Sequence, residues 1–460
     1  MTLAQLAAAV RERRVSAVDL VTMSLDRIER SNAGLNAVIR IREQALDEAR
    51  AMDARVAGGD DPGPLAGLPL LVKDMEDVEG MPSTFGSLTF ADAPAATADG
   101  LVPRRLRAAG AIVVGKTNQP EFAFAGYTIN ELYGATLNPW GTGWSPGGSS
   151  GGSAAALASG MAAIATATDG GGSIRIPAAF CGLAGLKPTN GVVGRQPVPD
   201  WIDLSTFGPF ATSIADLRLL LSVEAGPVAG DPSALPFPLA MGDELPRRVL
   251  ATTRFDGNGP VAADVEHRFD EALDGVERDL GWPVERVEPG SIFHAGSIGE
   301  DWFTLCGTEH LHRLGRAFLE ANMDRFSPDF RAAMLGAQRI SLETYLDARR
   351  RRFDHVRDLD LLLGDDAIIL TPTMRIGGFL PDGTLPGGGR DDDVYNTAET
   401  NVTGHPSLSV PAGLCDNEIP FGLQITGPRF RDDLVLNAGT AWEAAHPWPL
   451  AAPGYEPFAI

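Results

Sequence analysis

The stretch that most constrains how this chain can fold runs from 147 to 189 and contains two glycine-rich loops that each carry a serine. Between the loops, the alanine-rich run 153–161 predicts a helix that rises ~15 Å at ~1.5 Å per residue. The apolar run 163–168 predicts a strand, which returns a similar distance at ~3.3 Å per residue. We therefore expect Ser149 of the first loop and Ser173 of the second loop to lie side by side, as a two-serine active site requires.

The length and the charge of the chain limit its architecture and its partners. With 460 residues and 44% hydrophobic side chains, it can bury a substantial core, in one large domain or in two. The formal net charge of −22 argues against a nucleic-acid-binding surface, which needs clustered Lys and Arg. We therefore expect no nucleic-acid partner.

The three cysteines, Cys181, Cys306 and Cys415, lie far apart and form no C-x-x-C pair. They are typical of buried thiols in a reducing compartment and indicate neither a disulfide framework nor a zinc site. Charged residues interrupt the N-terminal segment every few positions, and no apolar run reaches the ~18 residues that a membrane span needs. We expect a cytoplasmic protein without a metal, a cofactor or a membrane partner.

Only three of the 38 basic residues are lysines: Lys73, Lys116 and Lys187. A lysine kept among so many arginines can do what arginine cannot, which is to lose its proton when it is buried. Lys73 follows the apolar run 68–72, which predicts a buried strand, and α/β folds place active sites at the carboxyl ends of strands. Burial there would lower the pKa of Lys73 and make it a base. An ion pair with Asp74 or Asp77 is the alternative.

Two short segments match catalytic motifs, but neither match is specific enough to indicate a function. Residues 110–117 fit the phosphate-loop pattern GxxxxGK[ST], but the middle of the match favours a strand and the Asn-Gln-Pro that follows is a poor helix start. We therefore predict no nucleotide site. Residues 147–151 fit the nucleophile elbow GxSxG, which needs a histidine and an acid later in the chain. None of the seven histidines stands in an informative setting, and a histidine-based hydrolase stays open as an alternative.

The rest of the chain alternates predicted helices and strands, which indicates an α/β architecture. Apolar spacing predicts helices within 3–31, and Ser16 with Asp19 predicts the cap of the second helix. The segment 224–245, rich in Pro, Gly and Ala, is a candidate linker or insertion. Beyond it we expect strands at 248–252, 284–287 and 367–370, two more within 407–426, and helices at 261–280, within 301–358 and at 433–445.

The second serine loop has three residues without side chains directly before Ser173: Gly170, Gly171 and Gly172. Backbone N–H groups in such a run can converge on one point and hold the oxyanion of a tetrahedral intermediate. A serine hydroxyl is a weak nucleophile until a base removes its proton, so the stretch needs a base from elsewhere in the chain. A tight glycine turn with no catalytic role is the alternative.

Longer motifs are more specific. The chain carries PGGSSGG at 146–152, DGGGSIRIPAAFCGLAGLKPT at 169–189, VKD at 72–74, GKTN at 115–118, and PSLSVPAG and PFGLQITG near 406–427. With these motifs, over essentially its whole length, it resembles the amidase signature family. The resemblance implies that family's fold, a single large domain (1–460) with a mixed β-sheet covered by helices. The signature core would occupy about 63–222, and 246–460 would complete the same fold.

The resemblance also implies a Ser-Ser-Lys triad that needs no cofactor. Ser173 would be the acylated nucleophile. Ser149, in a cis peptide linkage after Gly148, would relay the proton of Ser173 to Lys73, the base, and Ser150 would support Lys73.

Further roles follow from the same resemblance. The backbone N–H groups of Gly170, Gly171, Gly172 and Ser173 would form the oxyanion hole. Asp169 and Arg175 flank this loop and would hold it in place. Lys116 and Lys187 would be structural.

The implied reaction is amide hydrolysis through an acyl-enzyme, with the same chemistry extending to carbamates (urethanes) and esters. Segments 122–144 and 197–210 would line the substrate pocket and favour aryl or apolar amides; membership of the core is the alternative. Their candidate pocket residues are Phe124, Tyr127, Ile129, Leu132, Tyr133, Trp201, Ile202 and Phe207. We expect a monomer or homodimer that acts on a small molecule. An amidotransferase A-type subunit, active only with partner chains, is the competing hypothesis.

Overall fold

The computed structural model describes residues 1–236, 238–256, 259–389 and 394–460. Its described helices are α1 (Leu3–Arg11), α2 (Ala17–Leu35), α3 (Ala45–Gly58), α4 (Leu101–Ala108), α5 (Gly151–Ala158), α6 (Arg175–Cys181), α7 (Ile214–Glu224), α8 (Ala263–Leu280), α9 (Ile298–Leu314), α10 (Arg316–Asn322), α11 (Pro328–Ala337), α12 (Leu342–Leu363), α13 (Ala398–Thr403) and α14 (Asp432–Ala445). Its described strands are β1 (Val38–Ile41), β2 (Pro69–Lys73), β3 (Ile112–Thr117), β4 (Ile164–Ala165), β5 (Thr168–Asp169), β6 (Ala184–Lys187), β7 (Thr206–Phe207), β8 (Phe210–Ala211), β9 (Arg248–Ala251), β10 (Val284–Arg286), β11 (Ala367–Pro372), β12 (Ser407–Leu414) and β13 (Pro420–Thr426).

Two larger sheets organise the described strands. The seven-stranded sheet has the order β10-β9-β11-β13-β12-β6-β8; its first three strands are parallel and the remaining pairs are antiparallel. The second sheet has the order β1-β3-β2-β4, in which β2 lies between two parallel neighbours. The predicted α/β class with a large mixed sheet is confirmed. The additional four-stranded sheet, which carries Lys73, was not anticipated.

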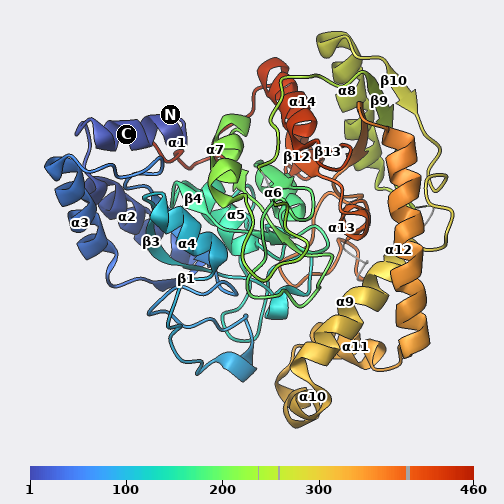
Figure 1. Ribbon diagram of the computed structural model, residues 1–460, viewed down its shortest axis with the longest axis horizontal. Coiled ribbons are helices and arrows are strands. Elements are labelled where there is room, and N and C mark those ends of the chain that lie inside the picture. Colours follow the sequence, from blue (N-terminus) through green and yellow to red (C-terminus); the bar gives the residue numbers. More distant parts are fainter. Residues whose placement is uncertain (237, 257–258, 390–393) are drawn as a thin grey trace.

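Helices surround these sheets and extend to both ends of the molecule (Figure 1). Helices α1–α3 lie at one end, whereas α9–α12 form an arm at the other. The C-terminal tail returns to α2, where the Arg27 guanidinium donates to the carbonyls of Gly160, Glu456 and Pro457. Residues from the two termini therefore stabilise the same end of the fold.

Most predicted elements are confirmed within a few residues. Ser16 and Asp19 form a reciprocal capping box at the start of α2, as their spacing predicts. The strands and helices expected beyond 246 are found as β9, α8, β10, α9 to α12, β11, β12, β13 and α14. No helix or strand lies between Glu224 and Arg248 in the described residues there, in keeping with a linker. The assignment of the whole chain to one domain stays a prediction.

The connection between the two serine loops differs from its prediction. Helix α5 begins and ends two or three residues earlier than expected, at Gly151 and Ala158. The single strand predicted at 163–168 is wrong: β4 pairs with β2, whereas β5 pairs with β7 in a separate two-stranded ladder. The Thr166 hydroxyl explains part of this change, because it accepts the N–H of Lys73 at 2.9 Å and ties the chain to the end of β2 just after β4.

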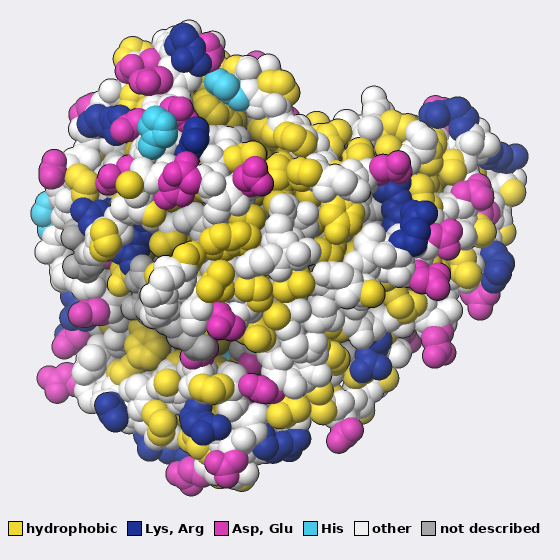
Figure 2. Space-filling view, turned by 180° about the vertical axis from the view of Figure 1, so that it is seen from behind, with side chains coloured by type: hydrophobic (Ala, Val, Ile, Leu, Met, Phe, Trp, Pro, Cys, Tyr) yellow, Lys and Arg dark blue, Asp and Glu magenta, His cyan; other side chains and the backbone are white. Residues whose placement is uncertain are grey.

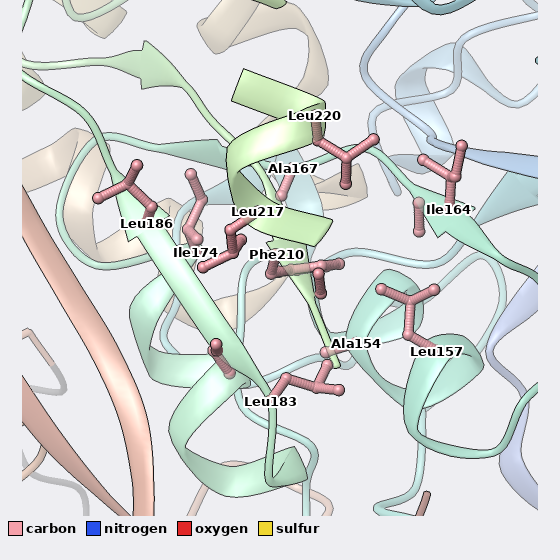
Figure 3. Packing of buried hydrophobic residues seen from close by; sticks show 14 of the residues in the cluster. Ala154, Leu157, Ile164, Ala167, Ile174, Leu183, Leu186, Phe210, Leu217 and Leu220 are labelled. Atoms are coloured by element: carbon pink, nitrogen blue, oxygen red, sulfur yellow. The ribbon is translucent and has the colours of Figure 1, made fainter. Parts of the chain in front are cut away.

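A continuous hydrophobic core lies beneath the serine loops. Leu157 of α5, Phe210 of β8, and Leu217 and Leu220 of α7 belong to this core, together with Leu186 of β6 (Figure 3). Each of these five side chains is at least 95% buried. Since burial of a large apolar side chain stabilises by about 1.5–3 kcal/mol, this packing gives the loops a rigid support.

The surface shows no concentration of basic side chains on the face drawn in Figure 2. Because all three lysines are buried, the basic side chains at the rim are arginines, which alternate with Asp and Glu; hydrophobic side chains gather toward the middle of that face. Among the described residues, none of the helices combines the length and the apolar character that crossing a bilayer requires.

Candidate active site

Lys73 is the last residue of β2, the strand that runs through the four-stranded sheet. It lies opposite Thr117 of β3 and is completely buried. The phosphate-loop match at 110–117 falls largely within β3, so the prediction that this segment is a strand is confirmed. The sheet therefore places a lysine at the carboxyl end of a buried parallel strand, as expected for an α/β active site.

The Lys73 amine contacts three hydroxyl groups. Its Nζ atom lies 2.8 Å from Oγ of Ser149, 2.9 Å from Oγ of Ser150 and 3.0 Å from Oγ1 of Thr168. A neutral amine has two N–H donors and one lone pair, so one of the three hydroxyls donates its proton to Nζ when Lys73 is uncharged. This arrangement suits proton transfer between a serine and the lysine.

Burial is the main influence on the charge of Lys73. It lowers the pKa of the side chain to about 7, while the nearby carboxylates of Glu76 and Asp169 oppose this shift. Desolvation disfavours the ammonium because the interior cannot replace the hydration that the charge loses. A substantial fraction of Lys73 is therefore neutral near pH 7.

The ion-pair alternative proposed for Lys73 fits Lys116 instead. The Asp74 carboxylate lies 3.9 Å from Nζ of Lys116 and accepts the Thr84 hydroxyl at 2.6 Å. The Asp77 carboxylate accepts the Ser83 hydroxyl. Lys116 also donates to the Asp74 carbonyl at 2.8 Å, so it holds the turn that follows β2.

The two serine loops are in direct contact. The peptide bond between Gly148 and Ser149 is cis, and the next N–H, that of Ser150, donates to the Ser173 carbonyl at 3.3 Å. Ser149 and Ser173 line the same cavity. The two serine loops therefore lie side by side, as expected.

Asp169 and Arg175 form a buried ion pair behind the second loop. The Arg175 guanidinium donates through Nε and Nη2 to the two carboxylate oxygens of Asp169 at 3.0 and 2.8 Å, and both side chains are completely buried. Burial alone would raise the pKa of Asp169, but Arg175 and the hydrogen bond from Asn401 hold it at about 2. The carboxylate also accepts the N–H groups of Gly172 and Ile174, so it fixes the loop backbone on both sides of Ser173.

Close packing requires each of the three glycines of the second loop. A Cβ atom on Gly170 would overlap the Trp201 ring, and one on Gly171 would lie 2.6 Å from the Trp302 ring. Gly172 has a φ of +131°, which side chains rarely tolerate, and a Cβ there would overlap Thr397. The aromatic rings therefore approach the backbone closely only because these residues lack side chains.

The predicted oxyanion hole needs a correction at Gly172. The N–H of Gly172 donates to Asp169 at 2.8 Å and is not available to a substrate oxygen in this structure. The carbonyl of Gly170 accepts the Trp302 indole N–H at 2.8 Å. Since N–H and C=O point in opposite directions across a trans peptide, this bond turns the N–H of Gly171 away from Trp302. The amides of Gly170, Gly171 and Ser173 are the remaining candidates.

Ser173 lies between two cavities. The larger has a volume of about 820 Å³ and the smaller about 190 Å³; Ser173, Ala123 and Trp201 line both. Ser149 lines only the smaller cavity. An amide bound across Ser173 would therefore have separate space for its acyl portion and its amine portion.

Only part of the predicted pocket lines these cavities. Phe124 and Tyr127 line the larger cavity, Phe207 the smaller, and Trp201 both. The prediction is corrected for the other members of the set, which line neither cavity: Ile129, Leu132, Tyr133 and Ile202. Ile129 packs against a hydrophobic cluster that includes Phe180, and the Tyr133 hydroxyl lies 3.2 Å from Oγ1 of Thr84. Aromatic character in a loop does not determine which way its side chain faces.

One histidine lies in the smaller cavity together with Ser149 and Ser173. His310 is buried among the rings of Phe122, Phe124 and Phe330, and its Nδ1 lies 3.0 Å from the Asp200 carboxylate. Among the described residues, neither serine hydrogen-bonds to a histidine.

The matching family is now clear from comparison with known proteins. A family model described as Amidase matches residues 19–436. The chain belongs to the amidase signature family. It is 34% identical to the A-type subunit of glutamyl-tRNA(Gln) amidotransferase from Aromatoleum aromaticum over 98% of each chain. It is 33% identical to indoleacetamide hydrolase of Bradyrhizobium diazoefficiens, over 95% of this chain and 85% of that protein.

The fold of this amidase agrees with a solved member of the family. The crystal structure of a bacterial aryl acylamidase, an amidase signature enzyme, matches with a TM-score of 0.88 and 29% identity over 97% of this chain and 96% of that chain. The chain is thus an amidase signature amidohydrolase. The identity of this chain to the hydrolase and its identity to the amidotransferase subunit are nearly equal, so sequence identity alone does not distinguish these two activities.

Several contacts of this amidase's site were not predicted from its sequence. Trp302 and Thr397 bind the carbonyls of Gly170 and Gly171, and Thr168 is the third hydroxyl on Lys73. Trp302 and Thr397 come from α9 and the residue before α13, far along the chain from the loop they contact. Thr168 lies directly before the signature motif and could have been suspected because hydroxyls commonly solvate a buried amine.

Proposed function

We propose that this protein is a serine-dependent amidase that cleaves aryl or apolar amides through an acyl-enzyme on Ser173, with carbamates and esters as further substrates. The observation that carries the proposal is the 2.8 Å contact between a buried, partly neutral Lys73 and the hydroxyl of Ser149, a residue that lines the same cavity as Ser173. The aryl acylamidase and indoleacetamide hydrolase relatives support an aromatic substrate.

In the proposed reaction, Lys73 is the base that accepts a proton and later returns it. Neutral Lys73 takes the Ser149 proton while Ser149 takes the proton of Ser173, and the Ser173 oxygen bonds to the amide carbon. Loop N–H groups stabilise the resulting oxyanion. As the C–N bond breaks, the proton returns through Ser149 to the departing nitrogen. Water then attacks the acyl ester by the same relay and releases the carboxylic acid.

The test of the nucleophile is mass spectrometry of the protein after reaction with a fluorophosphonate. We expect a single adduct on Ser173, because that serine is the one that forms the covalent intermediate. The Ser173→Ala variant should take up no label and should hydrolyse no anilide. A label on Ser149 instead would refute the assignment.

A histidine-based mechanism predicts a different pattern. If the GxSxG serine, Ser149, were the nucleophile with His310 as its base, the Ser173→Ala variant would keep its activity and a His310→Gln variant would lose it. We expect the reverse order of effects. Comparing kcat/KM for an activated anilide between these two variants separates the hypotheses.

The amidotransferase alternative has support from the relative of Aromatoleum aromaticum, whose identity equals that of the hydrolases to within a few per cent. An A-type subunit would act only with partner chains. The purified chain alone is therefore assayed on a panel of anilides, carbamates and short aliphatic amides. Turnover of aryl amides without added protein favours the amidase. A strong preference for small polar amides contradicts the proposed aryl or apolar specificity.

A further inference from the structure

The larger cavity beside Ser173 combines aromatic walls with acidic groups. Its volume is about 820 Å³, and its aromatic lining includes Phe124, Tyr127, Trp201, Trp302 and Phe303. All charged residues among the described lining are acidic: Glu300, Asp329 and Glu399. Aromatic faces and carboxylates both attract a cation, through the ring quadrupole and through direct charge pairing.

Glu399 is the most buried of these carboxyl groups. It lies in α13 with only 2% of its surface exposed. One carboxyl oxygen accepts the N–H of Asn396 at 3.3 Å, and the other, Oε2, is buried without a hydrogen-bond partner. A buried polar atom without a partner is costly, and Glu399 lines the cavity, so a ligand held in the cavity is positioned to complete this group.

Within the part of the chain that the structure describes, Glu399 forms no ion pair. Burial and the nearby Asp256 raise its pKa to about 8, and only Arg175 opposes them among the named charges. The Arg175 guanidinium is already paired with Asp169 at 2.8 Å. Arg375 stacks on the ring of Tyr395, another lining residue, at 3.7 Å. A cation brought in by the substrate would therefore stabilise the carboxylate form of Glu399, which burial disfavours.

The position of Ser149 decides which part of the substrate reaches Glu399. In the proposed relay, Ser149 returns the proton to the leaving nitrogen, so the amine portion lies on its side. Ser149 lines the smaller cavity only, whereas Glu399 lines the larger one. The acyl portion consequently occupies the larger cavity.

On the basis of the function proposed above, we propose that Glu399 recognises a positively charged group on the acyl portion of the substrate, so that the preferred amides carry an ammonium on an acyl chain of suitable length. The aromatic rings would pack against the methylene chain and the cation. The Glu399 carboxylate would bind the ammonium through a charge-assisted hydrogen bond.

The experiment compares matched pairs of nitroanilides over a series of chain lengths. One member has a straight acyl chain that ends in a methyl group, and the other has an ω-ammonium in its place. At a pH of about 8, an alkylammonium with a pKa of ~10.4 stays protonated. We expect the wild-type protein to prefer the ammonium member at one or more lengths. In Glu399→Gln, this ratio of kcat/KM values should fall about 10- to 100-fold, the range expected for a lost buried charge pair.

Controls separate this effect from folding and from long-range attraction. The ratio cancels a general loss of active protein, and a thermal melt checks the fold of Glu399→Gln. The matched control is Glu43→Gln, which removes one exposed carboxylate that lines neither cavity and should leave the ratio unchanged. Isothermal calorimetry with Ser173→Ala gives the same ratio as Kd values, without needing turnover.

The outcomes distinguish the two proposals. Turnover of the neutral anilides tests the amidase function alone, whatever the charge preference. A wild-type preference for the methyl member at every length, or an unchanged ratio in Glu399→Gln, would overturn the role of Glu399. A preference seen only when the ammonium is moved to the amine portion would overturn it as well, since that result places the cation in the other cavity.

Discussion

Lys73 and Ser149 form a hydrogen-bonded pair inside the protein, with Nζ 2.8 Å from Oγ and neither side chain exposed to solvent. The two residues come from different elements: Lys73 ends a strand, and Ser149 belongs to the loop before α5. Because burial keeps the lysine near its neutral form, a pair of this kind can move a proton where an exposed lysine would stay charged.

Replacement of Lys73 by arginine should remove nearly all turnover although arginine carries a positive charge. A guanidinium does not release its proton at neutral pH, so no base remains for Ser149. We expect kcat/KM for an activated anilide to fall about 10³-fold, within the usual range for loss of a general base. A circular dichroism melt confirms folding of the variant. An active Lys73→Arg protein would exclude the lysine as the base.

The pH dependence of the wild-type protein should follow deprotonation of Lys73. Its pKa of about 7 predicts that kcat/KM rises with pH, with a midpoint at about 7, and falls about tenfold per pH unit well below it. The reason for the sign is that only the neutral amine accepts a proton. A rate profile that decreases through this range would contradict the neutral-lysine mechanism.

Glu76 provides a sharper version of the pH experiment. Its carboxylate favours the charged form of Lys73, so Glu76→Gln should move the midpoint to lower pH. Burial also raises the pKa of Glu76 itself to about 7. If Glu76 rather than Lys73 were the titrating group, the substitution would remove the midpoint altogether. Whether the midpoint moves to lower pH or disappears therefore identifies the titrating group.

Asp169→Asn should destabilise the fold strongly. It leaves the completely buried Arg175 without its carboxylate, and breaking a buried pair from one side costs about 3–5 kcal/mol. The measurement is the free energy of unfolding in urea. Asp47→Asn is the matched control, since it breaks the pair of Asp47 with Arg50 at 2.5 Å on the exposed surface and should change stability little. Equal effects of the two substitutions would show that burial of the Asp169 pair carries no special stabilisation.

Gly170→Ala should impair the second loop by steric overlap with Trp201. The backbone at Gly170 can accommodate an alanine, so the overlap alone must shift the loop or the ring. A displacement of the nucleophile by about 1 Å costs about 100-fold in rate, and we expect a loss of that order in kcat/KM. Gly143→Ala, where no atom lies within 4 Å of the new Cβ, serves as the control. Full activity of Gly170→Ala would show that the loop tolerates the shift.

The local pattern of the sequence was enough to predict much of the candidate site. An apolar run predicts β2, and its end coincides with Lys73. Glycine and serine content alone indicates both loops, because few other residues suit such tight backbone turns. These features depend on neighbours along the chain, so they can be predicted before the fold is known.

Packing between distant segments decided the features of the site that the sequence did not predict. How distant segments meet determines which loop aromatics line the cavities. It also determines the hydrogen bonds that Trp302 and Thr397 donate to the glycine carbonyls, and the bond by which the Gly172 N–H is taken up by Asp169. No local periodicity encodes these contacts, since each needs two segments in one orientation. The sequence by itself determined which residue types were present for the reaction. Only the tertiary structure decided which of them meet, because burial and contact are properties of the packed chain.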